Sequence, residues 1–373
     1  MQYREFGNTG LKISALGFGA MRLPSKSEGD NWVVDRELAI AMIHRASELG
    51  VNYIDSAWGY HGGESEVVVG EALKGQRDKW ILSTKLPLWD VKTEASVRET
   101  LETQLKRLQT DRIDFYHLHG LSSKEQVDNL NSIKAFETLA KAKEEGLIKH
   151  LSFSCHGSPE FFMEQVDTGI FSSILAQYNL LDRNYEKAFL HTHKAGVGTV
   201  AMGPVAGGRL AFPSEEMDSK FEGKFQGTYE LALRFVLSNS SIDCALSGMS
   251  TMEQLESNAK IASMPDTLSV VEKEKIEIMS NESKAFNDLY CTGCNYCSGC
   301  PAGIKIAEVF KLVNYHKVFH LTEMAKREFK NIGTNDWNGK PVSDCTECGA
   351  CEEICPQHLK VIEELKIAER ELG

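Results

Sequence analysis

The feature that most constrains the fold is an alternation of short β-rich runs and amphipathic helical stretches, from residue 11 to about residue 260. Such alternation is typical of βα units built around a parallel sheet. The helical stretches include 36–49 and 131–145, and Gly50 and Gly146 follow them as glycines suited to left-handed helix ends. The β-rich runs are 14–19, 51–55, 80–85, 113–119, 148–154, 172–177, 198–202 and 243–247.

Eight such runs predict an α/β fold in which the sheet closes into a (β/α)₈ TIM barrel, rather than an open sheet. Before the first run, a turn-rich Gly7-Asn8-Thr9-Gly10 segment predicts a β-hairpin that plugs the bottom of the barrel. After about residue 265 the β pattern stops and the remaining chain is helical. We therefore expect a barrel over 1–265, a helical connection over 266–289 and a helical domain over 290–373.

Charge and cysteine content narrow the class of protein. The net charge of -12 argues against a nucleic-acid partner, because phosphates are bound by a basic surface. No apolar run is long enough for a signal peptide or a membrane span, so we expect a cytoplasmic protein without a membrane partner. In that reducing compartment, ten cysteines favour metal or redox sites over disulfides. Only Cys155 and Cys244 lie outside the segment 291–355.

Four polar residues lie at or just beyond predicted strand ends, where a TIM barrel carries its chemistry. They are Asp55, Tyr60, Lys85 and His119. Tyr60 can donate a proton to a developing alkoxide, and a nearby Lys85 ammonium is expected to lower the pKa of the phenol. Asp55 would hold Lys85 charged, and a neutral His119 would orient the substrate carbonyl. Each residue alone has an ordinary structural explanation, but all four at one rim favour catalysis.

Through several short motifs, residues 1 to about 262 resemble the aldo-keto reductases. They are Gly17-Phe18-Gly19, Asp55-Ser56-Ala57-Trp58-Gly59-Tyr60, Glu64-Ser65-Glu66 with Gly70, Ser83-Thr84-Lys85, and Asp114-Phe115-Tyr116-His117-Leu118-His119. The resemblance implies an oxidoreductase that interconverts a small-molecule carbonyl and an alcohol with NAD(P)H. It also implies that the four rim residues form the catalytic tetrad.

The same resemblance implies a nucleotide site, with departures. Ser154 and Gln177 match residues that hold the nicotinamide carboxamide, but Cys155 stands where an asparagine is expected, and His156 is a candidate replacement. No basic residue occurs over 247–259, and Gln254 occupies the usual basic position. NADPH is therefore expected on family grounds only, with NADH the alternative. The other implied cofactor residues are Gly19, Ala20, Met21, Gly203, Pro204, Gly207, Ser247, Gly248, Ser250 and Asn258.

Eight cysteines of the C-terminal segment form two quartets. The second, Cys345, Cys348, Cys351 and Cys355 followed by Pro356, has the spacing of bacterial [4Fe-4S] ferredoxins. The first, Cys291, Cys294, Cys297 and Cys300, is one residue shorter before its last cysteine. Zinc is the main alternative ligand.

In two-cluster ferredoxins the fourth cysteine of a run ligates the other cluster. One predicted cluster therefore uses Cys291, Cys294, Cys297 and Cys355, and the other uses Cys345, Cys348, Cys351 and Cys300. Because the chain between the quartets looks helical, the module resembles the α-helical ferredoxin type. Aldo-keto reductases with such a tail form a subgroup that the whole chain resembles.

The two halves carry different redox chemistry. A hydride delivers two electrons and a [4Fe-4S] cluster accepts one at a time, and no convincing flavin motif is found that would bridge them. The first hypothesis is a carbonyl reductase whose clusters are structural or relay electrons to a separate redox partner. The alternative is an electron-transfer protein whose barrel is a nucleotide-binding or docking body. Trp89 and the stretch 310–319 are expected to be buried core.

Overall fold

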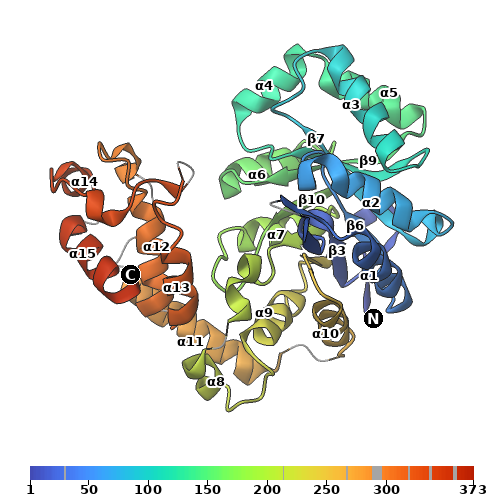
Figure 1. Ribbon diagram of the computed structural model, residues 1–373. Helices are drawn as coiled ribbons and strands as arrows, with labels where there is room; N and C mark the ends of the chain where they lie inside the picture. Colours follow the sequence, from blue (N-terminus) through green and yellow to red (C-terminus); the bar gives the residue numbers. More distant parts are fainter. Residues whose placement is uncertain are drawn as a thin grey trace. The chain divides into compact units, whose positions relative to one another are not determined.

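A computed structural model describes residues 1–28, 31–212, 214–265, 268–287, 296–317, 320–335, 338–355 and 359–373. The chain forms two compact units (Figure 1). The first comprises Met1–Gly207 and Glu230–Thr267, and the second comprises Gly208–Tyr229 and Leu268–Gly373. The short segment Gly208–Tyr229 thus groups with the C-terminal part of the chain, although the sequence placed it within the barrel region.

The first unit is a closed barrel of eight parallel strands, as the sequence predicts. Each strand pairs in parallel with its neighbours, and the last pairs with the first. Strand β7, for example, is buried along its whole length, which is typical of parallel strands covered on both faces. The strands are β3 (Leu16–Gly19), β6 (Tyr53–Asp55), β7 (Ile81–Pro87), β8 (Ile113–His119), β9 (Ile148–Cys155), β10 (Ser173–Gln177), β11 (Gly198–Met202) and β12 (Cys244–Ser247).

Helices connect successive strands and lie around the barrel (Figure 1). Their starts are set by short polar side chains. Asp35 accepts a hydrogen bond from the Leu38 amide at the start of α1, and Thr93 forms a capping box at the start of α3. The helices are α1 (Arg36–Glu48), α2 (Glu64–Leu73), α3 (Glu94–Arg107), α4 (Lys124–Ser132), α5 (Ala135–Glu144), α6 (Pro159–Asp167), α7 (Glu186–Lys194), α9 (Thr228–Leu237) and α10 (Met252–Ala262).

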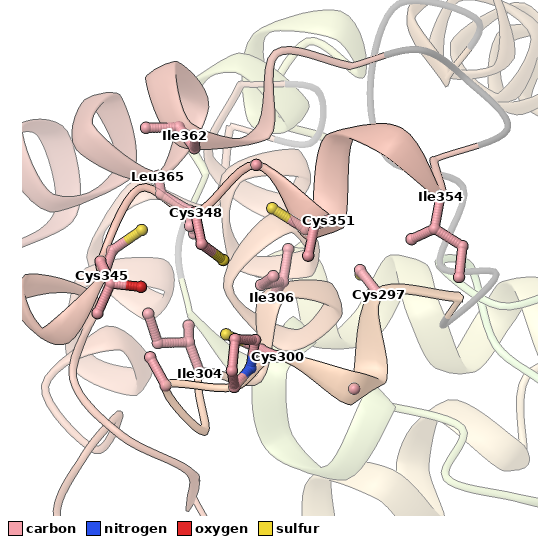
Figure 2. Close-up of a pocket in the computed structure, with 16 residues that line it drawn as sticks. Cys297, Cys300, Ile304, Ile306, Cys345, Cys348, Cys351, Ile354, Ile362 and Leu365 are labelled. Carbon is pink, nitrogen blue, oxygen red and sulfur yellow. The ribbon is translucent and has the colours of Figure 1, made fainter.

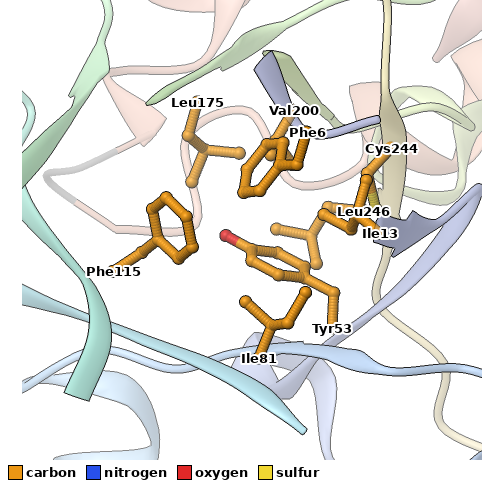
Figure 3. Packing of buried hydrophobic residues seen from close by; sticks show 9 residues of the cluster. All are labelled: Phe6, Ile13, Tyr53, Ile81, Phe115, Leu175, Val200, Cys244 and Leu246. Atoms are coloured by element: carbon orange, nitrogen blue, oxygen red, sulfur yellow. The ribbon is translucent and has the colours of Figure 1, made fainter. Parts of the chain in front are cut away.

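The predicted hairpin is present, and Phe6, next to its turn, packs into the interior of the barrel. Strands β1 (Tyr3–Glu5) and β2 (Lys12–Ser14) pair antiparallel, and Phe6 between them is fully buried. The Phe6 ring packs against Phe115, with 4.8 Å between centroids, inside the apolar cluster of Figure 3. A Cβ at Gly198 would lie 2.5 Å from this ring, so the neighbouring strand leaves room for the plug. A second hairpin, β4 (Ser25–Glu28) with β5 (Asn31–Val34), was not predicted, since β4 is polar and exposed.

The described part of the second unit contains helices and no strand. Helices α12, α13 and α15 contact one another through buried apolar side chains such as Val313, Met324 and Leu365. Phe310 is buried here, as predicted, whereas residues 318 and 319 of the predicted stretch lie outside the described residues. None of the described helices is both long and apolar enough to cross a membrane. The helices are α8 (Glu215–Lys220), α11 (Val270–Asn287), α12 (Ile306–Lys317), α13 (Thr322–Phe329), α14 (Ala350–Glu353) and α15 (Val361–Leu372).

Candidate active site and cysteine cavity

The four predicted catalytic residues meet at one rim of the barrel. Asp55 ends β6, Lys85 lies in β7 and His119 ends β8, and these three strands are neighbours. Tyr60 begins a short 3₁₀ helix, η3 (Tyr60–Gly63), in the loop that leaves β6. Because parallel strands end at the same edge, residues distant in sequence lie side by side.

Lys85 is the centre of this group. Its side chain is 1% exposed, and its Nζ donates to Asp55 Oδ2 at 2.5 Å and to the Ser56 carbonyl at 2.6 Å. Nζ also lies 4.8 Å from the centroid of the Tyr60 ring. Burial lowers the pKa of Lys85, but Asp55 and Tyr60 outweigh burial, so the net pKa is raised and the ammonium is kept.

The pKa of the Tyr60 phenol is set by opposing influences. Burial raises the pKa of Tyr60, Lys85 lowers it and Asp55 raises it, and the net pKa lies above the ordinary value of 10.0. Lys85 lowers this pKa, as expected, but burial and Asp55 together raise it by more, so the net pKa is raised. Tyr60 consequently holds its proton at neutral pH, as a proton donor must.

His119 is neutral, as predicted. Burial and the nearby Lys85 lower its pKa to about 3, and its buried Nδ1 has no hydrogen-bond partner among the described residues. The Tyr60 and His119 rings meet edge to face, with 6.2 Å between centroids. Trp89 packs on His119 at 4.9 Å but is 53% exposed, so the expectation of a buried Trp89 is wrong.

A second layer of buried polar side chains lies beneath the rim. Ser83 Oγ lies 2.7 Å from Asp55 Oδ1 and 3.0 Å from the Tyr53 hydroxyl, which lies 3.4 Å from His117 Nε2. The one Ser83 proton goes to the carboxylate, the stronger acceptor, so Asp55 is held on both oxygens. The sequence contained a signal for this layer: Tyr53, Ser83 and His117 each precede a rim residue by two positions, and alternate strand residues share a face.

The residues predicted to hold a nicotinamide lie at the ends of β9 and β10. Ser154 Oγ accepts the Gly120 amide at 2.8 Å, which leaves its own hydroxyl proton for donation. Gln177 Nε2 donates to Asp182 at 2.7 Å, and its carbonyl oxygen lies 3.7 Å from the position that a Cβ at Gly203 would occupy. The Ser154 hydroxyl can therefore donate a hydrogen bond and the Gln177 carbonyl oxygen can accept one, which matches the acceptor and donor of a carboxamide.

Cys155, which stands where the family has an asparagine, is part of the buried core in this chain. The Cys155 side chain is buried, its Sγ accepts the Gly157 amide at 3.3 Å, and burial raises the pKa of the thiol. A neutral buried thiol does not reproduce the hydrogen bonds of an asparagine amide. The neighbouring His156 is exposed to solvent, and its main-chain amide donates to Ser122 Oγ.

Two of the predicted cofactor residues, Gly19 and Ser247, lie close together at the ends of β3 and β12. A Cβ at Gly19 would lie 3.2 Å from the Ser247 carbonyl oxygen, so a side chain there would require a small shift of the neighbouring main chain. Gly203 and Gly207 have φ of 64° and 67°, which favours glycine. Two other predicted residues, Gln254 and Asn258, lie in α10 and make hydrogen bonds to the segment that precedes this helix. Gln254 Oε1 accepts the Ser250 amide at 2.8 Å, and Asn258 donates to Ser247 Oγ at 3.2 Å.

In the second unit, five cysteines line one cavity: Cys297, Cys300, Cys345, Cys348 and Cys351. Figure 2 shows the sulfur atoms of Cys300, Cys345, Cys348 and Cys351 turned towards a common space, with isoleucine side chains around it. Burial is the largest influence raising the pKa of the Cys351 thiol, and Cys300 and Cys345 add to it. The cavity contains Cys345, Cys348, Cys351 and Cys300, the set that cross-ligation predicts, together with Cys297, which was predicted for the other cluster.

The other predicted set is only partly described. Cys291 and Cys294 lie outside the described residues, and Cys355 is described but does not line this cavity. Among described residues, no three Cys, His, Asp or Glu side chains gather closely enough for a single metal ion. A cubane differs from one ion because its four thiolates bind four separate irons and stand further apart. An all-thiol cavity walled by aliphatic side chains fits an iron–sulfur cluster.

Sequence comparisons match the two parts of the chain separately. The profile described as "Aldo/keto reductase family" matches residues 15–226, and the profile described as "4Fe-4S dicluster domain" matches residues 290–359. The oxidoreductase YqkF of Bacillus subtilis is 29% identical over 324 residues, which cover 78% of this chain and 98% of that protein. L-galactose dehydrogenase of Arabidopsis thaliana is 28% identical and covers 74% of this chain and 93% of its own.

Two further comparisons bear on cofactor and fold. An Escherichia coli protein named NADH-specific methylglyoxal reductase is 28% identical, with 69% of this chain and 92% of that protein covered. The solved holo structure of an aldo-keto reductase from Bacillus halodurans is 30% identical and has a TM-score of 0.64. That likeness covers 74% of this chain and 96% of the solved chain.

Proposed function

The chain belongs to the aldo/keto reductase family and carries a C-terminal 4Fe-4S dicluster domain, and on that premise we propose that it interconverts a small carbonyl compound and its alcohol. Tyr60 is the proposed general acid, supported by Lys85, Asp55 and His119. The observation that carries the proposal is the buried Lys85 ammonium, bound to Asp55 and placed beside the Tyr60 ring. A buried charge is costly unless paired, and here the pair lies beside a phenol at the barrel rim.

Proton transfer follows from these contacts. In the reductive direction a bound nicotinamide nucleotide supplies the hydride, and the Tyr60 hydroxyl donates its proton to the carbonyl oxygen. Lys85 then stabilises the phenolate that Tyr60 becomes, because an ammonium close to the ring favours the charged form. Asp55 keeps Lys85 protonated and directed towards Tyr60. In the oxidative direction the same phenolate accepts the alcohol proton.

His119 is the proposed orienting group for the substrate. With its pKa lowered to about 3, the imidazole is neutral and carries one N–H that can donate to the carbonyl oxygen. An imidazolium would instead compete with Tyr60 as proton donor. The neutral ring therefore separates the two tasks, with His119 positioning the oxygen and Tyr60 protonating it.

The nucleotide is proposed to be NADPH, with NADH the alternative. Ser154 as donor and Gln177 as acceptor would orient the carboxamide, without help from Cys155. The family resemblance supports NADPH. The missing basic residue over 247–259 and the name of the Escherichia coli relative point the other way. Both nucleotides therefore belong in every assay.

The cysteines are proposed to hold two [4Fe-4S] clusters. Cys345, Cys348, Cys351 and Cys300 would hold one, and Cys291, Cys294, Cys297 and Cys355 the other, as the shared cavity supports for the first set. When bound, such clusters supply one-electron transfer. Carbonyl reduction by hydride does not require them, so we propose that they are structural or pass electrons to a separate redox partner.

The test uses protein prepared without oxygen and a panel of aldehydes, ketones and alcohols with NADPH and NADH. We expect turnover by the wild type and a loss of about 10²–10⁴-fold in kcat for Tyr60→Phe, the usual range for a removed general acid. Tyr3→Phe is the matched control, since Tyr3 is an exposed tyrosine whose hydroxyl donates to the Gly50 carbonyl.

Two results would overturn parts of the proposal. Unchanged turnover by Tyr60→Phe would remove the tetrad assignment and favour the electron-transfer alternative. Iron analysis tests the other half: about eight irons per chain are expected for two cubanes. Stoichiometric zinc in place of iron and sulfide would rule the clusters out.

A further inference from the structure

Tyr60 is carried by a turn whose main chain is strained. His61, Gly62 and Gly63, directly after it, have φ of 51°, 65° and 94°, in the left-handed region. Glycine adopts that region readily, but a histidine does so at a cost in energy. Such a conformation persists only where surrounding contacts hold it in place. Contacts from outside the loop must therefore hold the turn that places the proposed general acid.

Arg107, in α3, contacts both ends of this turn. Its guanidinium lies over the Trp58 ring, with 4.0 Å from Cζ to the ring centroid, and its Nη1 donates to the Trp58 carbonyl oxygen at 3.4 Å. A Cβ at Gly63 would lie 3.2 Å from the same Nη1. Because Trp58 precedes Tyr60 and Gly63 follows it, one guanidinium lies against the main chain on both sides of the phenol.

Glu66 joins Arg107 to the strand that carries Lys85. This carboxylate is fully buried in the first turn of α2, and Arg107 Nη1 donates to its Oε2 at 3.2 Å. Its Oε1 accepts from Thr84 Oγ1 and from Gln104 Nε2, both at 2.6 Å. Thr84 directly precedes Lys85 in β7, and Gln104 also donates to the Lys85 carbonyl at 3.0 Å. The same side chains thus bind both β7 at Lys85 and the loop that leads into α2.

We propose that Arg107 and Glu66 are positioning residues for proton transfer, which fix the Tyr60 hydroxyl relative to the Lys85 ammonium and the substrate carbonyl. This inference rests on the proposed function, because it assumes that Tyr60 is the general acid. Arg107 acts through the main chain near Trp58 and Glu66 acts through β7, so neither is itself a catalytic residue. Their effect on rate is large because a displacement of about 1 Å at the reacting atoms can cost on the order of 10²-fold.

A second arginine of α3 provides the matched control. Arg98 is partly exposed and donates to Glu102, in the same helix, and to Glu145, the residue after α5. Neither partner lies in the Tyr60 loop. Arg98→Met therefore removes an arginine and two carboxylate contacts from the same helix without removing a contact to that loop.

The test compares Arg107→Met with Arg98→Met in the full, cluster-loaded protein. With NADPH and 4-nitrobenzaldehyde, or the panel carbonyl that the wild type reduces fastest, Arg107→Met should lower kcat about 10- to 100-fold. The solvent isotope effect on kcat in D₂O should rise, because transfer of the Tyr60 proton then limits the rate more strongly. NADPH affinity measured by calorimetry should stay close to that of the wild type, because the proposed nucleotide residues lie at other strand ends. Arg98→Met should match the wild type in all three measurements.

Two further variants separate positioning from stability. Arg107→Lys should recover part of kcat, since an ammonium still pairs with Glu66 but lacks the planar group that lies over Trp58. Glu66→Gln/Arg107→Met leaves no buried charge unpaired, so in urea unfolding it should be more stable than Arg107→Met. Its kcat should nevertheless stay low, because the contacts to the Tyr60 loop are still missing.

The outcomes separate this inference from the proposed function. The positioning role would be overturned if Arg107→Met kept the kcat of the wild type, or if kcat fell without a rise in the isotope effect. It would also be overturned if the double variant regained kcat together with stability. In each of these cases the proposed function would stand. If the wild type reduced no carbonyl of the panel, or if Tyr60→Phe were fully active, the proposed function would fail and this inference with it.

Discussion

The candidate site of the barrel and the cysteine cavity of the second unit are held together differently. At the barrel rim Lys85 and Ser83 each donate a hydrogen bond to the Asp55 carboxylate. In the second unit Cys300, Cys345, Cys348 and Cys351 line one cavity without a disulfide between them. The barrel site is organised by its own opposite charges, whereas four thiols offer one another no attraction. We therefore expect a bound group to stabilise the cysteine cavity, whereas the barrel site is organised by contacts among its own side chains.

The largest expected effect lies in the buried ion pair. Lys85→Met leaves the Asp55 carboxylate buried without its counter-ion, which should cost about 3–5 kcal/mol of barrel stability. It should also lower kcat by on the order of 10²-fold or more. Urea unfolding followed by tryptophan fluorescence measures the first and steady-state kinetics the second.

The double variant Asp55→Asn/Lys85→Met is the control for this effect. It should recover much of the stability, because no charge remains unpaired, while activity stays low. If Lys85→Met were as stable and active as the wild type, the barrel site would not be organised by its charges.

The second largest expected effect is the loss of iron when a cysteine of the second unit's cavity is replaced. Cys300→Ala should lower iron from about eight to about four atoms per chain, because it removes a ligand from the cluster of Cys345, Cys348 and Cys351. Hydride-dependent carbonyl reduction should stay within about twofold, since the clusters are proposed to be separate from it. Cys155→Ala, in the barrel, is the control and should leave iron unchanged. A loss of reductase activity in parallel with iron would show that the two units are not independent.

Acid should remove the contributions of two barrel histidines and of one carboxyl of the second unit over different pH ranges. In the barrel, burial and Lys85 lower the pKa of both His117 and His119 from 6.5 to about 3. The unfolded chain then binds protons that the folded barrel does not, so stability present above pH 6.5 is lost as pH falls towards 3, on the order of a few kcal/mol.

In the second unit the group to compare is Glu272, a carboxyl with a strongly lowered pKa. Burial raises the pKa of this carboxyl, but hydrogen bonds from Lys224 and Ser269 lower it to about 2. Its contribution should be lost only between pH 4.5 and 2. Unfolding midpoints measured against pH, with His119→Gln and Glu272→Gln, test the order of the two losses. Loss of the His119 and Glu272 contributions over the same pH range would contradict it.

The smallest expected effect is that of Ser83→Ala. Asp55 keeps Lys85 but loses the hydrogen bond to Oδ1, which should cost about 1–3 kcal/mol of stability. Activity should fall by less than in Lys85→Met, and the pH profile of kcat should move because Asp55 is less firmly held. An unchanged pH profile would mean that Ser83 contributes packing alone.

The sequence predicted much of the barrel because its signals are local. Eight β-rich runs correspond to the eight strands, and the end residues Asp55 and His119 follow from where those runs stop. Tyr53, Ser83 and His117 were missed although their spacing by two was visible. A polar residue at the rim is expected to take part in catalysis, whereas a tyrosine or serine within a strand is usually explained by packing in the sheet.

By itself the sequence determined the strand number, the rim residues and the cysteine spacing, since these depend on periodicity along a few neighbouring residues. Only the tertiary structure decided the net rise in the pKa of Tyr60, the exposure of Trp89 on His119 and the contact of Arg107 with the Tyr60 loop. Each of these depends on burial or on contacts between segments far apart in the chain. Arg107 and Trp58 are separated by 49 residues in sequence, and only the packing of α3 against α2 brings them together.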